Sequence, residues 1–233
     1  MKYQTFIPLG PSCAATGILK WTNLRRFSYP LDWTRSGSAH LEDLFRLKPD
    51  EYFFKHISTP NIQLVSDAPP SVQNNSTSSL SINLPVYGYN YFFNPHKVPS
   101  ALKRHSQRCL ERFASVTSRT DVYLNFLMAV DGNLRTNEES LDNFELIATF
   151  LFNVISRYVS CERFNITLCS CFTKNIPLVE INKLDIFDQA RYVKLYLPTL
   201  FTGPASGEYR DFITGKLLYS RETISRYPIL QSV

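Results

Sequence analysis

The residues Phe6-Ile-Pro-Leu-Gly-Pro-Ser-Cys-Ala-Ala-Thr16 decide the fold. An apolar run ends at Gly10, Ser12 and Cys13 follow, and a helix-compatible stretch then continues to Trp21. This order predicts a strand, a tight turn and a helix, which is how an α/β sheet presents side chains at its strand ends. The positive end of such a helix favours a reactive thiolate at Cys13. A buried, inert cysteine at a strand end is the alternative interpretation.

Composition indicates one folded domain. The chain has 233 residues, of which 44% are hydrophobic, so it can bury a sizeable core. The N-terminus lacks a signal-peptide pattern, and no apolar run reaches the length of about 18–20 residues that a membrane span needs. Five cysteines at irregular positions are typical of free thiols in a reducing compartment. We therefore expect a cytoplasmic protein without a membrane span.

Hydrophobic periodicity predicts an α/β fold in which a mixed or mostly parallel sheet is flanked by helices. Strands are expected at Tyr3–Leu9, Tyr87–Phe93, Asp121–Leu127, Phe164–Phe172 and Tyr192–Leu197, and helices at Ala14–Leu24, Leu41–Leu47, from Pro99 to about Val116, and Glu138–Val159. Tyr3–Leu9 and Asp121–Leu127 are expected to be central strands. Residues 58–85 are rich in Ser, Asn and Pro and are predicted to form a long polar loop.

The domain is expected to span residues 1–233. Residues 1–130 carry the motifs described below, and residues 131–233 complete the sheet and its edge. The tail from Thr199 onward has a mixed character that suits the covering of a sheet edge.

Four histidines are candidates for a general base. His40 and His56 lie in or beside polar helical segments and are expected to be exposed. His105 lies near the boundary of the apolar stripe of its helix. His96 follows a predicted strand end, which places it beside Cys13 if both strands belong to one sheet and end on the same side. A plain surface histidine is the alternative for His96.

Asp32 is the candidate for an orienting carboxylate because it follows Tyr29-Pro30 and precedes Trp33, which can shield it. A carboxylate there also suits a turn cap or an ion pair with Arg25 or Arg26. Both interpretations are open from the sequence, with a slight preference for His96 as the partner of Asp32.

Two stretches carry a family resemblance. Pro8-Leu-Gly-Pro-Ser-Cys13 and Leu24-Arg-Arg-Phe-Ser-Tyr-Pro-Leu-Asp-Trp33 resemble the N-terminal signature of the bacterial papain-like cysteine peptidases, a domain family of unknown function. Phe92–His96 and Glu111-Arg-Phe113 fit the continuation of that signature. The likeness covers roughly residues 5–130. The resemblance implies that Cys13 is the nucleophile, His96 the general base and Asp32 the orienting group.

The chain departs from the family pattern at two positions. Leu31 stands where the family usually has Phe, and Lys97 replaces the acidic residue after the histidine, which removes one candidate for orienting His96. The family name implies a cysteine on a helix against a largely antiparallel sheet, whereas this sequence favours strand, turn and helix in an α/β sheet.

The function that these observations favour is a thiol hydrolase or acyl transferase acting on an amide or ester. Substrate contacts are expected from residues around the motifs, namely Ser12, Arg25, Tyr29, Trp33 and Arg112. Gly10-Pro-Ser12 also resembles the block that carries the serine of SGNH-type esterases, so a Ser12 esterase or sugar-modifying enzyme is an alternative. The SGNH Asp-x-x-His near the C-terminus is absent, and no histidine follows His105.

A third possibility is a non-catalytic module that binds an anionic partner. Lys103, Arg104, Arg108 and Arg112 make a basic flank on a predicted helix, although a solvated face is the simpler interpretation. No nucleic-acid motif, Gly-rich phosphate loop, dinucleotide fingerprint or metal-ligand spacing accompanies it, so we expect no cofactor, no metal and no nucleic-acid partner. The sequence leaves the substrate (peptide, acyl or glycan) and the oligomeric state open.

Overall fold

The computed structural model describes residues 1–10, 14–32, 34–35, 38–56, 63–65, 81–84, 89–91, 99–131, 137–172, 181–183, 188–196, 210–211, 214–215, 217 and 227–233. Of the predicted site residues, Ser12, Cys13, Trp33 and His96 lie outside this set.

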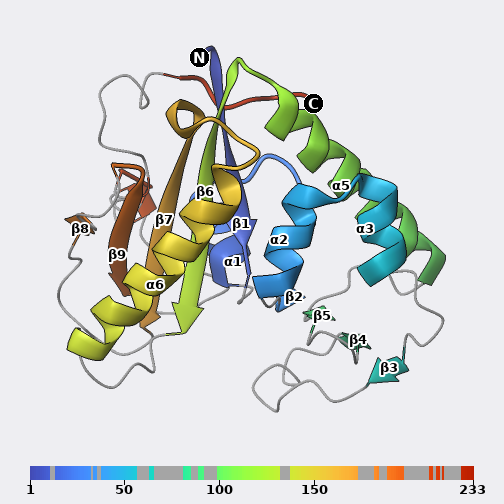
Figure 1. Cartoon of the computed structure of the whole chain (residues 1–233), viewed down its shortest axis with the longest axis horizontal. Coiled ribbons are helices and arrows are strands. Elements are labelled where there is room, and N and C mark those ends of the chain that lie inside the picture. The colour runs from blue at the N-terminus through green and yellow to red at the C-terminus, as the bar shows by residue number, and fades with distance from the viewer. Residues whose placement is uncertain are drawn as a thin grey trace.

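A five-stranded sheet forms the centre of the molecule (Figure 1). Its order is β1 (Tyr3–Leu9), β6 (Val122–Asp131), β7 (Phe164–Phe172), β9 (Ala190–Tyr196) and β8 (Ile181–Lys183). The first four strands run parallel, and β8 is antiparallel to β9. The α/β fold with a mostly parallel sheet is therefore confirmed.

The position of β1 differs from the prediction. β1 is the outer strand of the five and not a central one. Its outer side is not bare, because the backbone of Gln4 accepts from Leu230 at 2.9 Å and donates to Pro228 at 3.0 Å. The C-terminal segment thus lies against this edge, as expected from the sequence. Local patterning marks β1 as buried but carries no information on strand order.

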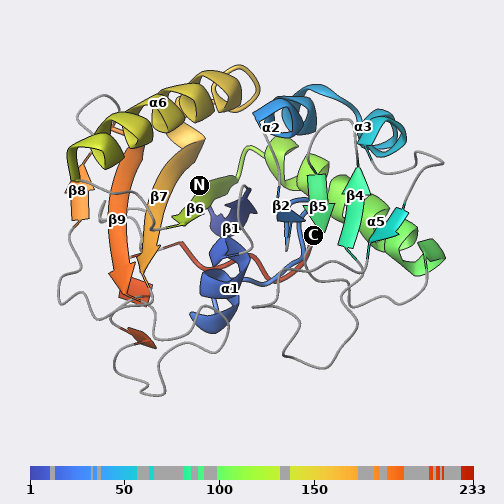
Figure 2. The ribbon, with the colours of Figure 1, turned by 90° about the horizontal axis from the view of Figure 1, so that it is seen from below.

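Helices cover both faces of this sheet (Figure 2). On one face, α6 (Asn137–Ile155) presents buried side chains that repeat near the helical period, namely Phe144, Ala148, Leu151 and Ile155. On the opposite face, α1 (Ala14–Trp21) buries the apolar side chains Ala14, Ala15, Ile18 and Leu19 against the sheet. The two helices therefore enclose the parallel strands in separate apolar clusters.

A polar ladder crosses the sheet on the α1 side. Asn125 Nδ2 donates to Gln4 Oε1 at 3.1 Å, and Asn165 Nδ2 donates to Asn125 Oδ1 at 2.9 Å. All three side chains are buried. Because a shift by one residue would place these amides on the other face, the ladder specifies the register of β1, β6 and β7.

A second, antiparallel sheet has the order β2 (Thr34–Arg35), β5 (Tyr89–Tyr91), β4 (Ser81–Leu84) and β3 (Gln63–Val65). In Figure 1 it lies toward the end of the molecule at which the parallel strands point. β3 and β4 fall inside residues 58–85, the stretch predicted as a polar loop. The other residues of that stretch lie outside the described set. β5 belongs to this small sheet, so the condition under which a strand end would place His96 beside Cys13, one sheet shared with β1, is not met.

A short 3-10 helix, η1 (Cys161–Arg163), leads into β7, and three further α-helices belong to the described fold. They are α2 (Ser38–Arg46), α3 (Pro49–His56) and α5 (Pro99–Ser118). The predicted apolar stripe of α5 comprises Leu102, Cys109, Phe113 and Val116, and the last three are buried, whereas the side chain of Leu102 lies outside the described ones. Among the described helices, none combines the length and hydropathy that crossing a bilayer requires.

Candidate functional site

The strand–turn–helix unit of the sequence analysis has its strand and its helix in place. β1 ends at Leu9, and α1 begins at Ala14, the residue bonded to Cys13. Ser12 and Cys13 belong to the connection between them, which lies outside the described residues.

Asp32 is fully buried and forms an ion pair with Arg25. Arg25 Nε donates to Asp32 Oδ2 at 2.8 Å, and Arg25 Nη2 contacts the same oxygen. Arg25 Nη2 also donates to Ser28 Oγ at 2.7 Å. The alternative of an Arg25 ion pair, left open by the sequence, is thus present, while a contact between Asp32 and His96 concerns a residue outside the described set.

Burial dominates the electrostatics of Asp32. It raises the pKa of the carboxyl from 3.8 to about 6, although Arg25, the backbone of Tyr29 and the Thr16 side chain all lower it. Thr16 lies in the first turn of α1, three positions after Cys13. The two stretches of the family signature therefore meet at the N-terminal end of α1.

Tyr29 anchors the segment that carries Asp32. Its side chain is 2% exposed, and its hydroxyl lies 2.7 Å from Thr5 Oγ1 of strand β1. Burial raises the pKa of Tyr29 to about 12, with the Thr5 hydrogen bond opposing. The ring of Phe27 packs edge-on against Tyr29, with centroids 6.5 Å apart. These contacts hold the segment against β1.

Arg112 joins helix α5 to the same segment. Its Nη1 donates to the Ser28 carbonyl at 2.7 Å, and its guanidinium carbon lies 5.5 Å from the centre of the Phe27 ring. This contact spans 84 positions of sequence. The sequence analysis included Arg112 through its family position, and the structure shows which backbone group it holds.

The described chain contains a Cys–His contact that the sequence analysis did not single out. Cys109 Sγ lies 3.4 Å from His105 Nε2, one helical turn away on α5. Burial raises the pKa of Cys109 to about 12, with the Asp32 charge adding to that effect. A thiol with such a pKa stays protonated at neutral pH, so this pair does not supply a nucleophile.

His40 and His56 correct a second expectation. Both are buried and not exposed, at 1% and 2%, and their ring centres lie 4.4 Å apart. His56 Nε2 lies 2.8 Å from Asp43 Oδ2, and Lys55 Nζ donates to the same oxygen at 2.5 Å. The histidine spacing within polar helices gave no sign of burial, because Asp43 and His56 come from two different helices, α2 and α3.

The carboxylate of Asp43 contacts the side chains of Lys55, Arg46 and His56. Burial alone raises the pKa of Asp43, but hydrogen bonds from Lys55, Arg46 and His56 outweigh it and lower the pKa to about 2. Burial lowers the pKa of His56, with Asp43 opposing. Within the described ranges no group of three or more His, Cys, Asp or Glu side chains is arranged to hold a metal ion. The cluster therefore suits a structural role that ties α2 to α3.

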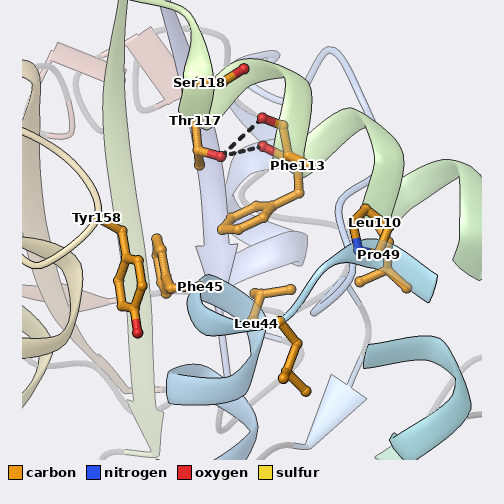
Figure 3. A pocket seen from close by; sticks show the side chains of 10 residues that line it. Leu44, Phe45, Pro49, Leu110, Phe113, Thr117, Ser118 and Tyr158 are labelled. Atoms are coloured by element: carbon orange, nitrogen blue, oxygen red, sulfur yellow. Dashed lines mark hydrogen bonds between the residues drawn. The ribbon is translucent and has the colours of Figure 1, made fainter. Parts of the chain in front are cut away.

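An apolar cavity of about 250 Å³ lies between α2, α5 and the chain after α6 (Figure 3). Leu44, Phe45, Phe113 and Tyr158 line it. The Thr117 hydroxyl at its rim donates to the Phe113 carbonyl at 2.9 Å and is thus engaged within its own helix. The cavity shares no lining residue with the Arg25–Asp32 segment, so we do not place the chemistry there.

The comparison with protein families decides the affiliation. The model of the family described as "putative papain-like cysteine peptidase (DUF1796)" matches residues 4–173, roughly three quarters of the chain. The chain belongs to this family. The match includes β1, α1, the Arg25–Asp32 pair and α5. No curated protein and no solved structure matches the chain.

The family title names an architecture as well as a chemistry. The described part of this peptidase-family chain has a central sheet of four parallel strands and one antiparallel strand, in place of a largely antiparallel one. The α/β expectation taken from the residues is therefore the one that the structure confirms.

Proposed function

We propose that the chain is a thiol hydrolase or acyl transferase acting on an amide or ester, with Cys13 as nucleophile, His96 as general base and Asp32 as orienting carboxylate. The observation that carries the proposal is that the two stretches of the family signature meet at the start of α1. Cys13 is bonded to the first residue of this helix, and the Asp32 carboxyl interacts with Thr16 in its first turn.

The helix start suits thiol chemistry. The N-terminal end of an α-helix carries a partial positive charge, which lowers a thiol pKa and stabilises an anion. The thiolate of Cys13 would attack the carbonyl carbon after its proton passes to His96. Backbone N–H groups at the beginning of α1, that of Ala14 among them, would stabilise the oxyanion. His96 would then give this proton to the departing amine or alcohol, which leaves an acyl-enzyme. Water or a second acceptor, deprotonated by His96, would release the acyl group and restore the Cys13 thiolate.

The small sheet supports the participation of His96. Thr34 of β2 pairs with Tyr91 of β5. Thr34 comes two positions after Asp32, and Tyr91 comes five positions before His96. Because the strands are antiparallel, the start of β2 and the end of β5 lie at the same end of the strand pair. Five extended residues reach at most about 17 Å, so connectivity permits a contact between His96 and Asp32.

We also propose Ser12, Arg25, Tyr29, Trp33 and Arg112 as the residues around the substrate. Arg25 and Tyr29 are engaged by Asp32 and Thr5, which suits them to positioning the segment. Arg112 has direct access to a cavity. We further propose that residues 1–233 form one domain that acts in the cytoplasm, which the free thiols of Cys109 and Cys161 support.

Alkylation with iodoacetamide tests the thiolate at Cys13. We expect Cys13 to react at pH 6 at least ten times faster than Cys161, because its thiolate should persist well below the ordinary thiol pKa of about 8.5. Peptide mass spectrometry resolves each cysteine by site. Cys161 is a suitable internal reference because it is partly exposed and free. Equal rates at Cys13 and Cys161 across pH 6–9 would refute the thiolate.

A serine esterase of the SGNH type, using Ser12, is the second candidate. The parallel sheet favours it, since that architecture is shared with such esterases. Cys13→Ala and Ser12→Ala separate the two when assayed on aryl esters and amides. If Cys13→Ala alone abolishes turnover, the thiol mechanism stands; if Ser12→Ala alone does so, the esterase mechanism replaces it.

A further inference from the structure

A second cavity, of about 370 Å³, lies between helix α5 and the segment that precedes Asp32. This volume is at the lower end of the range for small-molecule sites, about 300–1,000 Å³. Three arginines line it, namely Arg26 from the segment and Arg108 and Arg112 from the helix. Ser28, Phe27, His105 and Cys109 complete the wall. No described residue of the lining carries a carboxylate.

The guanidinium of Arg112 is held in place on one side. One nitrogen donates to the Ser28 carbonyl at 2.7 Å, and its plane lies over Phe27. No other hydrogen bond or ion pair involves Arg112 within the part of the chain that the structure describes. Because the guanidinium group is already fixed, the Arg112 side chain loses less conformational entropy when an anion binds.

Arg26 and Arg108 bring two further charges. Among the described residues, neither forms an ion pair or a side-chain hydrogen bond. Glu111 lies three positions after Arg108 on α5, the spacing of a helical ion pair, yet no such pair forms. Both arginines are exposed, so they can reach a ligand from solvent.

The neighbouring groups do not cancel this charge. The charge of Asp32 acts on Cys109, which lines the cavity, but Asp32 is already paired with Arg25. Cys109 remains a neutral thiol because burial raises its pKa to about 12. Ser28 Oγ accepts from Arg25 at 2.7 Å, which leaves its O–H able to donate to a ligand. Protonation of His105 would add a fourth charge.

We propose that this basic cavity binds a dianionic phosphoryl group, either free phosphate or the phosphate of a small phosphomonoester. Three guanidinium groups exceed what one carboxylate needs, since a single arginine pairs with a carboxylate through two parallel hydrogen bonds. A phosphoryl group offers three oxygens and two charges, which match three arginines and one hydroxyl. Arg112 is shared with the residues proposed around the substrate of the thiol chemistry, but phosphoryl binding in this cavity does not require a reactive Cys13.

Titration calorimetry with orthophosphate at pH 7.5 and constant ionic strength tests the site. We expect saturable binding to the wild type, and a dissociation constant at least ten times higher for the Arg26→Gln, Arg108→Gln double variant. Arg157→Gln is the matched control, because Arg157 is exposed and far along the chain on the turn after α6. It should bind within twofold of the wild type. No saturable binding to the wild type, or an equal loss in Arg157→Gln, would overturn the proposal.

Protection against phenylglyoxal provides a measurement that needs no variant. Orthophosphate should slow modification of Arg26, Arg108 and Arg112 in the wild type while leaving Arg157 unaffected. Phenyl phosphate distinguishes the two sources of the group: protection at lower concentration than orthophosphate assigns a phosphomonoester, and protection only at higher concentration assigns free phosphate. Uniform protection of all arginines would refute a built site. The alkylation rate of Cys13 reports the thiol separately, so the two proposals can fail independently.

Discussion

Replacing Asp32 by asparagine removes a buried charge without changing the shape of the side chain. The carboxyl is fully buried and bound to Arg25, yet burial raises its pKa to about 6. The pKa of the folded state thus lies above the ordinary value of 3.8. The folded protein holds its proton more tightly than the unfolded chain, so folding is favoured by Asp32 below about pH 4, and this contribution is lost as the pH rises through 6.

The magnitude follows from the shift. A change of one pKa unit corresponds to 1.36 kcal/mol, so a shift of about two units is worth about 3 kcal/mol. Because the unfolded carboxyl is already about half ionised at pH 4, the wild type should lose about 2–3 kcal/mol of this between pH 4 and pH 8, which Asp32→Asn retains. The difference between the two proteins isolates Asp32, because every other titrating group is common to both.

Urea unfolding at pH 4, 5, 6, 7 and 8, followed by tryptophan fluorescence, measures this difference. Asp121→Asn is the matched control, since Asp121 also pairs with an arginine but is part-exposed, and its pKa is lowered through the Arg119 hydrogen bond. That variant should gain no stability relative to the wild type at alkaline pH. A constant difference between Asp32→Asn and the wild type from pH 4 to pH 8 would show that Arg25 keeps Asp32 ionised throughout, and the reasoning from burial would be refuted.

Three further outcomes are expected, each measured as the free energy of unfolding in urea. Tyr29→Phe should destabilise the fold by about 1–2 kcal/mol because the buried Thr5 hydroxyl loses its hydrogen-bond partner. Adding Thr5→Val to this variant should cost little more. If the two single effects were fully additive, a direct hydrogen bond between the side chains would be contradicted. Asp43→Asn should destabilise the fold by about 1–3 kcal/mol at neutral pH, since His56 is buried against Asp43. The effect should vanish as the pH falls through about 2, the pKa of Asp43 in the folded protein. An effect of the same size in acid would exclude the charge of Asp43 as its cause. Phe113→Ala should destabilise by about 3–5 kcal/mol because the ring is buried in the main core, and a loss below 1 kcal/mol would mean that the apolar cavity beside it collapses freely.

Strong local patterns were sufficient for the large elements. Tyr3–Leu9 and Phe164–Phe172 are strands with the predicted bounds, and α6 follows the apolar repeat that predicted it. Each of these segments buries many apolar side chains, so its own composition specifies its conformation. The small sheet was missed at β3 and β4, because strands of three or four residues depend on pairing partners and show no period of their own.

The candidate site was predictable where its contacts are short-range. Arg25 and Asp32 are seven positions apart, and their pairing was one of two interpretations open from the sequence. The burial of His40 and His56 and the contact between Arg112 and Ser28 were not predictable, because both depend on how separate helices pack. The same packing assembles the basic cavity from two segments that are far apart in the chain.

The pairing of β1 with β6 has a consequence for synthesis of the chain. The hydrogen-bond partner of Gln4, Asn125, is synthesised 121 positions later. The strand pairing runs from Tyr3 opposite Val122 to Leu9 opposite Met128. At about 5–20 residues per second, the ribosome needs on the order of ten seconds to supply that partner. Throughout this interval the apolar side chains of Phe6, Ile7 and Leu9 have no neighbouring strand in their own sheet. We expect the nascent chain to depend on holdase chaperones during this interval, and pulse-labelled ribosome complexes stalled before and after residue 131 should differ sharply in chaperone occupancy.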